Sequence, residues 1–231
     1  MVAVKSLISA AVETKDVLAE LAKGVDDAGL SPDLVCVFYD ANHDDRLIFQ
    51  FLQDRFPEAQ ILGGTSCGGA MSETGLGGSD SVGLLMIEDP DGDYGVASVT
   101  FDDDPAMCAE RALNLALENA GCPGELPELI WIYQAPGQEE KVIAGLRRVV
   151  GDRCPIIGGS AADNAVAGQW RQIGPDGPIS NGLAIGVLFS SGGIGFAFEG
   201  GYEPSGPSGI VTKVGYGTDG NSGVVTQARG R

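Results

Sequence analysis

The sequence predicts an α/β protein built from two similar halves, each with helices and a mixed parallel and antiparallel sheet. The first observation is that amphipathic helical segments alternate with short, continuous apolar runs, a pattern typical of parallel strands covered on both faces. The second is an internal match, because a shift of 95 residues places Gly63 and Gly64 on Gly158 and Gly159. The same shift aligns DLVCVFYD with ELIWIYQA, so we expect an internal duplication.

In the first half, a helix is expected over residues 14–28, with its apolar residues at helical spacing on one face. The run LVCVFY at 34–39 predicts a buried strand, and a second helix with Ile48 and Leu52 on its inner face follows. A short strand then ends in a Gly-Gly pair, which completes a βαβ crossover of the usual right hand. Strands at 81–87 and 94–101 come next, and the turn sequence DPDGD between them predicts a hairpin.

The second half repeats this order. A helix begins near Pro105, a strand covers 129–134, and a further helix has Val142 and Leu146 on its inner face. A strand ending in the second Gly-Gly pair and strands at 184–190 and 194–201 complete it. We therefore expect one domain over residues 1–202, with halves at about 1–95 and 96–200, and a separate Gly-rich tail at 203–231.

The net charge of −18 makes nucleic acid and anionic membrane surfaces improbable partners, because both would be repelled. Such acidity is typical of proteins from a salt-rich cytoplasm, where screening reduces self-repulsion, so a halophilic source is one interpretation. No apolar run is long enough to span a membrane, and the N-terminus lacks the pattern of a signal peptide. We expect a cytoplasmic protein.

The five cysteines have no CxxC spacing, which disfavours a disulfide framework or a zinc site. We assign no catalytic residue, no metal ligand and no cofactor from the sequence.

The two Gly-Gly corners are the candidate ligand site. Glycines at the carboxyl ends of parallel strands let backbone N–H groups approach a ligand closely, and ligands bind α/β sheets at that edge. Small hydroxyl side chains follow each corner, and the second loop adds a carboxylate and an amide, a set that suits a small polar or zwitterionic molecule. The alternative is a purely structural strand-to-loop turn. The candidate residues are Gly63, Gly64, Thr65, Ser66, Gly158, Gly159, Ser160, Asp163 and Asn164.

Other features allow other functions. His43, the only histidine, follows one parallel strand and Cys67 follows the next, so a Cys67–His43 dyad could support a cysteine-dependent enzyme. His43 could instead be an axial haem ligand of a gas sensor, or simply a residue of a helix start. Asp44 and Asp45 are expected to complement a helix dipole. Arg171 could contact an anionic ligand group, or be a solvated surface side chain.

Taken together, PDLVCVFYDANHDD, ILGGTSCGGAMS and SDSVGLLMI, followed by IIGGSAADN and SNGLAIGVLF, resemble the N-terminal module of the FIST family over most of residues 14–200. The resemblance implies a non-catalytic sensory domain that binds a small ligand, such as an amino acid, for signal transduction. It also implies a signalling partner, such as a histidine kinase or a chemoreceptor. The family usually continues into a C-terminal module, of which the tail at 203–231 would be the start.

Overall fold

The structure is a computed structural model that describes residues 1–197, 203, 205–206, 208–216 and 223–230. The chain divides into two compact units, Met1–Ile194 and Gly195–Arg231.

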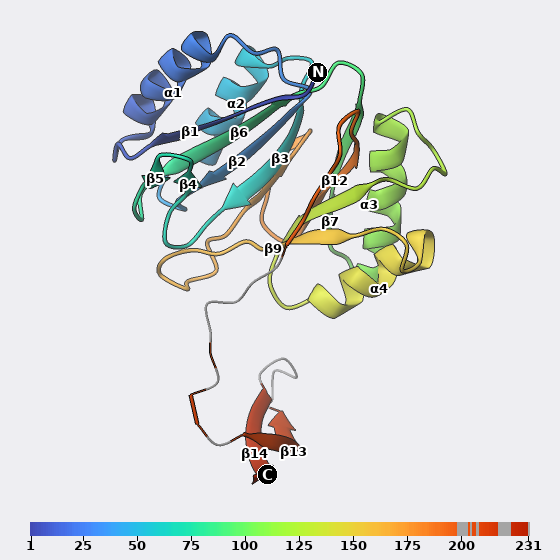
Figure 1. Ribbon diagram of the computed structural model, residues 1–231. Helices are drawn as coiled ribbons and strands as arrows, with labels where there is room; N and C mark the ends of the chain where they lie inside the picture. The colour runs from blue at the N-terminus through green and yellow to red at the C-terminus, as the bar shows by residue number, and fades with distance from the viewer. Residues whose placement is uncertain (198–202, 204, 207, 217–222, 231) are drawn as a thin grey trace. The chain divides into compact units, whose positions relative to one another are not determined.

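The first sheet of the larger unit has the strand order β1-β6-β2-β3-β10-β11. Strands β2 and β3 run parallel, and each other pair in this sheet is antiparallel. Helices α1 (Thr14–Ala28) and α2 (Asp45–Arg55) cover its outer face (Figure 1). The strands are β1 (Ala3–Ser9), β2 (Leu34–Tyr39), β3 (Gln60–Thr65), β6 (Val82–Glu88), β10 (Gln172–Gly174) and β11 (Gly177–Ile179).

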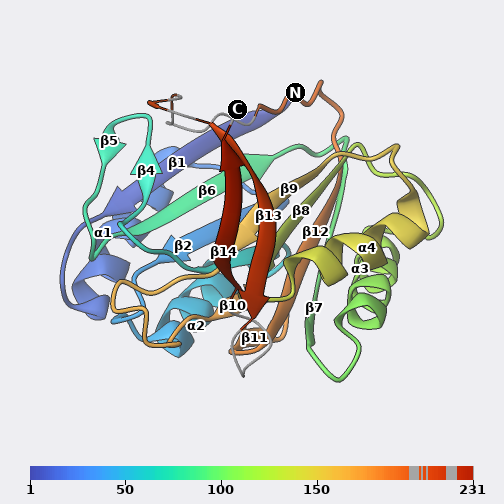
Figure 2. The same ribbon diagram turned by 90° about the horizontal axis from the view of Figure 1, so that it is seen from below.

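The second sheet has the order β7-β12-β8-β9, in which β8 and β9 run parallel. Helices α3 (Pro105–Asn119) and α4 (Glu139–Val150) cover its outer face, as Figure 2 shows from below. The strands are β7 (Asp93–Thr100), β8 (Leu129–Gln134), β9 (Ile156–Ser160) and β12 (Gly182–Phe189).

The two sheets pack face to face, so the larger unit has four layers in the order helices, sheet, sheet, helices. One apolar cluster lies between each sheet and its own helices, around Leu52 in the first half and Leu113 in the second. A third cluster lies between the sheets and joins Leu34 and Leu62 to Val96 and Leu188. The predicted α/β class with mixed sheets is confirmed, and the sequence had left open whether one sheet or two would form.

The two sheets share one strand order. The series β1-β6-β2-β3 has the same succession of antiparallel, antiparallel and parallel pairs as β7-β12-β8-β9. This agreement supports the expected internal duplication, although common descent of the halves stays a prediction. The expected helix at 14–28 and the strands at 34–39 and 129–134 have the predicted bounds.

The predicted hairpin between 81–87 and 94–101 is wrong. Strand β6 is paired on both sides, by β1 and β2, while β7 pairs with β12 in the other sheet. The cause is the N-terminal strand β1, which the sequence analysis did not predict and which takes the edge position that β7 would need. The expected strand at 194–201 is also absent from its described part, 194–197, and the rest lies outside the described residues.

Smaller elements complete the chain. A short flap, β4 (Met71–Ser72) and β5 (Gly75–Leu76), follows β3. In the smaller unit, β13 (Gly209–Tyr216) and β14 (Gly223–Gly230) form an antiparallel pair. Within the described residues, no helix has the length and apolar character needed to cross a membrane.

Candidate functional site

The first glycine of each corner is required by packing inside its sheet. A Cβ atom at Gly63 would lie 1.8 Å from the carbonyl oxygen of Val37, and one at Gly158 would lie 1.8 Å from that of Ile132. Both glycines also have a positive φ, of 152° and 129°. Any side chain here would strike the neighbouring parallel strand, so these two residues explain the repeated motif without a ligand.

The second glycine of each corner differs between the halves. Strand β10 covers Gly64, where a Cβ atom would lie 2.1 Å from the carbonyl oxygen of Arg171. A Cβ atom at Gly159 would meet nothing within 4 Å, and this glycine is exposed. The first corner is therefore closed by protein, and the second is open.

The two corners lie beside each other. The carbonyl oxygen of Thr65 accepts hydrogen bonds from the backbone N–H of Ala162, at 3.1 Å, and from the hydroxyl of Tyr133. However, the N–H of Thr65 donates to Arg171 and that of Ser66 donates to Tyr39. The expected cleft of unpaired backbone amides is therefore not present at the first corner, because the chain itself uses them.

The polar residues of the second loop also have internal partners. The carboxylate of Asp163 accepts from the N–H groups of Ala167 and Gln169, which lower the pKa of Asp163. Asn164 accepts from the N–H of Gly68 and donates to the carboxylate of Asp40, so it ties the two halves together. Both residues organise the loop, and their contact with a ligand stays a prediction.

The hydroxyl residues are placed similarly. Ser160 donates to the carboxylate of Glu139 at 2.6 Å, and Ser66 donates to the carbonyl oxygen of Gly69 at 3.3 Å. Thr65 is buried, and its hydroxyl oxygen accepts from the N–H of Arg171 at 2.9 Å. Thr65 therefore fixes the backbone of Arg171, which lines a polar pocket at this edge of the sheet.

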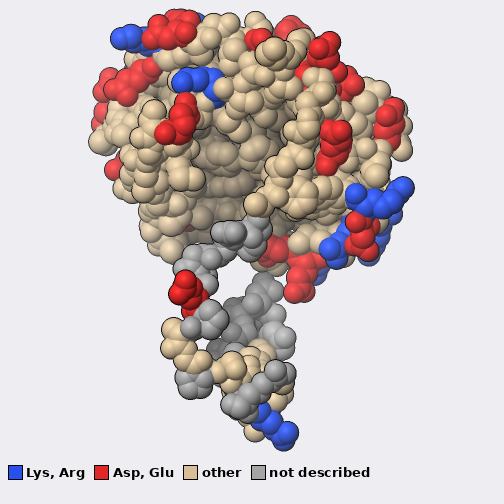
Figure 3. Space-filling model, in the orientation of Figure 1, with Lys and Arg blue, Asp and Glu red and all other residues tan. Residues whose placement is uncertain are grey.

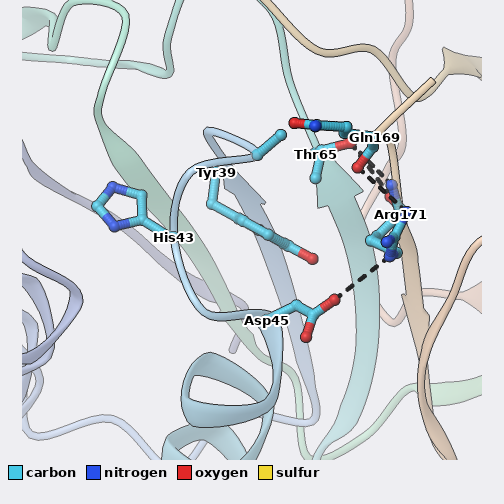
Figure 4. Close-up of a pocket in the computed structure, with 7 residues that line it drawn as sticks. Tyr39, His43, Asp45, Thr65, Gln169 and Arg171 are labelled. Atoms are coloured by element: carbon cyan, nitrogen blue, oxygen red, sulfur yellow. Dashed lines mark hydrogen bonds and ion pairs between the residues drawn. The ribbon is translucent and has the colours of Figure 1, made fainter. Parts of the chain in front are cut away.

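A polar pocket of about 190 Å³ lies at the carboxyl ends of β2 and β3 (Figure 4). Tyr39, Ala41 and His43 come from the end of β2 and its following loop. Asp45 opens α2, Thr65 ends β3, and Gln169 and Arg171 come from the segment before β10. The pocket thus occupies the sheet edge predicted for ligand binding, but side chains rather than glycine amides form most of it.

Two opposite charges face each other in this pocket. The guanidinium Nε of Arg171 lies 3.5 Å from a carboxylate oxygen of Asp45, longer than the roughly 2.7–2.9 Å of a strong charge-assisted hydrogen bond. Arg171 also donates to the carbonyl oxygens of Gln169 and Trp170, which hold its side chain in place. The charges are therefore positioned by the chain and only loosely joined to each other.

The phenol of Tyr39 is the unusual group of the pocket. Tyr39 is only 1% exposed, yet its hydroxyl has no hydrogen-bond partner in the described part of the chain. Figure 4 shows the hydroxyl pointing from the end of β2 toward Asp45 and Arg171. Burial first, and then the charge of Asp45, raise the pKa of Tyr39, so the phenol stays a neutral donor and acceptor. A buried polar group without a partner is costly, so this hydroxyl is a candidate ligand contact.

His43 is held by the fold. Its Nε2 lies 2.7 Å from the carbonyl oxygen of Asp80, to which it donates, and its Nδ1 lies 3.2 Å from the hydroxyl of Thr14. Both ring nitrogens are therefore engaged, and neither bonds to Cys67, which is an exposed thiol. A dyad or a haem ligand would require His43 to break one of these bonds, so the residues present do not fit haem ligation through His43.

A sequence profile of the FIST N domain matches residues 33–227. The chain belongs to this family. The match confirms the family predicted from the order and spacing of the sequence motifs. FIST N domains are sensory domains of signal transduction.

Other comparisons add little to this assignment. No curated protein matches this FIST N domain. Among solved structures, a cyanuric acid hydrolase from A. caulinodans is similar over 84% of this chain and 68% of its own, with 12% identity and a TM-score of 0.45.

Two polar residues at the centre of the pocket in this FIST N domain, Tyr39 and Asp45, were not predicted from the sequence as ligand contacts. Tyr39 was read only as the last residue of a buried strand, and Asp45 as a helix-dipole residue. Asp44, not Asp45, caps α2, because its carboxylate accepts from the N–H groups of Arg46 and Leu47. A phenol at the carboxyl end of a parallel strand was the available signal, and its counterpart Gln134 has the same position in the second half.

Proposed function

We propose that this FIST N domain binds a small zwitterionic metabolite, such as an amino acid, in the pocket of Tyr39, Asp45 and Arg171. The ligand's carboxylate pairs with Arg171 and its ammonium with Asp45, and the Tyr39 hydroxyl completes the contacts. The observation that carries the proposal is the buried Tyr39 hydroxyl, which lies between two opposite charges and has no hydrogen-bond partner in the part of the chain that the structure describes.

The size of the pocket supports a small ligand. At about 30 Å³ per water molecule, 190 Å³ holds roughly six water-sized groups. This is below the roughly 300–1,000 Å³ of pockets for drug-sized ligands. A free amino acid with a short side chain is the class that fits both the volume and the paired charges.

The pocket also suggests how ligand binding changes the structure that a partner protein recognises. Arg171 directly precedes β10, a strand that joins β3 through only two residue pairs, Gln172 with Gly64 and Ile173 with Gly63. A ligand that moves the Arg171 side chain therefore shifts β10 relative to β3. We propose that the resulting shift is sensed by a signalling protein, such as a histidine kinase or a chemoreceptor.

A thermal-unfolding screen of amino acids at high salt tests the proposal. A ligand at 100 times its Kd should stabilise the native protein by about 2.7 kcal/mol. Arg171→Gln should lose this stabilisation, because the ligand carboxylate loses its only cationic contact among the residues lining the pocket. Arg148→Gln removes an arginine from an exposed ion pair with Glu110 and should respond like the native protein.

The screen has a decisive negative result. If no amino acid stabilises the native protein, or if Arg171→Gln and Arg148→Gln respond equally, the pocket does not bind a zwitterion.

A further inference from the structure

A second cavity lies on the opposite face of the first sheet. Successive strand residues point to opposite faces, so Tyr39 faces the helices and Phe38 faces away from them. Phe38 lines a cavity of about 290 Å³, together with residues of β1, β6 and the segment after β3. Other residues of its lining are Ser6, Ala70, Met71, Gly83 and Leu85. The end of β2 therefore contributes one side chain to each of two distinct cavities.

This cavity is uncharged and largely apolar. No charged residue lines it within the described part of the chain, in contrast to the Asp45–Arg171 pocket. Figure 3 shows a hollow in one view of the larger unit in which no Lys, Arg, Asp or Glu side chain is seen. The ring of Phe38 continues into an aromatic group, with the Trp131 ring stacked at 6.4 Å and the Tyr133 ring edge-on at 5.2 Å. An apolar molecule therefore gains contacts here and a charged one does not.

Glycine keeps the cavity open. A Cβ atom at Gly83 would lie 2.7 Å from the Cβ of Ala70, which also lines the cavity. Gly69, at the start of the flap segment, has a φ of 97°, a conformation that other residues rarely adopt. Small residues at these positions leave space that larger apolar side chains would otherwise fill.

The flap carries apolar side chains that nothing described covers. Met71 and Leu76 form a cross-strand pair and are 81% and 71% exposed, and Met71 lines the cavity. The flap is held to β1 by polar contacts, since Glu73 pairs with Lys5 at 3.1 Å and accepts from Ser6. The Glu73 contacts thus fix the flap to β1, and Met71 of the flap lies at the cavity, where it can cover an apolar ligand.

We propose that this cavity is a second binding site, which takes a flat, neutral, apolar molecule between Phe38, Leu85 and Met71 of the flap. An apolar cavity of about 150 Å³ holds benzene, so 290 Å³ has room for a fused two-ring compound. The site needs neither charge of the polar pocket, and its ligand class differs from a zwitterion.

Indole is the probe that tests this site. Saturation-transfer NMR and calorimetric titration should show that indole binds the native protein with a single saturable Kd. Leu85→Asn should weaken binding at least tenfold, because it places an amide in the floor of the cavity. Its matched control is Ile87→Asn, on the same strand and face and also half-buried, but outside the cavity lining.

A second variant avoids the problem of folding. Met71 is exposed, so Met71→Gln leaves the core intact and should weaken indole binding several-fold by making the flap polar. Arg171→Gln should bind indole as tightly as the native protein, which separates this site from the polar pocket. The proposal is overturned if indole fails to saturate the native protein. It is equally overturned if Leu85→Asn and Ile87→Asn lose the same affinity, or if Met71→Gln binds like the native protein.

Discussion

Gly158→Ala is expected to destabilise the protein by about 3 kcal/mol or more, the combined cost of overpacking and backbone strain. The new Cβ atom would lie 1.8 Å from the carbonyl oxygen of Ile132, in a residue whose φ is 129°. The parallel pair β8–β9 would have to separate to accommodate it. Urea unfolding at high salt measures the change.

Gly159→Ala is the matched control, one residue away. Its Cβ atom would meet nothing within 4 Å, so we expect a change below about 1 kcal/mol. Equal losses from both substitutions would show that the glycines are not distinguished by contact with β8. This pair of variants also separates packing from ligand binding, because only a ligand contact would make Gly159→Ala reduce affinity without reducing stability.

Asp89→Ala is expected to cost about 3 kcal/mol of folding free energy, because the buried Tyr94 hydroxyl and two neighbouring serines lose a charged acceptor at once. Asp89 is fully buried in the connection from β6 to β7. Its carboxylate accepts from the Tyr94 hydroxyl at 2.8 Å, from Ser190 at 3.0 Å and from the N–H of Ser191 at 2.9 Å. These contacts fasten the connection between the sheets to the segment after β12.

The exposed Asp91 in the same connection provides the control for Asp89. Among the described residues its side chain pairs only with the N-terminal ammonium, at 3.8 Å, so Asp91→Ala should change the free energy of unfolding by less than about 0.5 kcal/mol. A loss as large from Asp91→Ala as from Asp89→Ala would contradict the account.

The same carboxylate predicts a pH dependence. Burial by itself raises the pKa of Asp89, but the hydrogen bonds from Ser191, Tyr94 and Ser190 outweigh it and lower the pKa to about 2 from an ordinary 3.8. A carboxyl with a lowered pKa in the folded state stabilises it above the ordinary value and loses that contribution as the pH falls toward 2. Asp89→Asn should therefore remove part of the acid-induced loss of stability between pH 4 and 2.

Local patterns predicted much of the fold. Helix α1 and strands β2 and β8 could be placed because amphipathic and continuous apolar runs reflect burial directly. The position of β1 could not, since AVKSLIS is a half-exposed edge strand with little periodicity. Its pairing with β6 is a long-range contact, and it decides which sheet receives β7.

A pocket lies at the carboxyl ends of the parallel strands, the edge where the sequence places the candidate site, and Thr65 lies in it. Ligand binding at this edge stays a prediction. Tyr39 and Asp45 were missed because their meeting with Arg171 depends on where a loop more than 100 residues later folds back along β3. The packing role of Gly63 was weighed, but sequence alone does not give the distance between two backbones.

The proposed function requires that the Tyr39 hydroxyl, which has no partner among the described residues, is completed by a ligand. Tyr39→Phe tests it through the free energy of unfolding, measured by urea titration with and without the amino acid found in the screen. Without ligand, the substitution should stabilise the protein by about 1 kcal/mol, since it removes an unpaired buried polar group. With ligand, the added stabilisation should be smaller than in the native protein. A loss of stability without ligand, or an unchanged response to the ligand, would contradict the account.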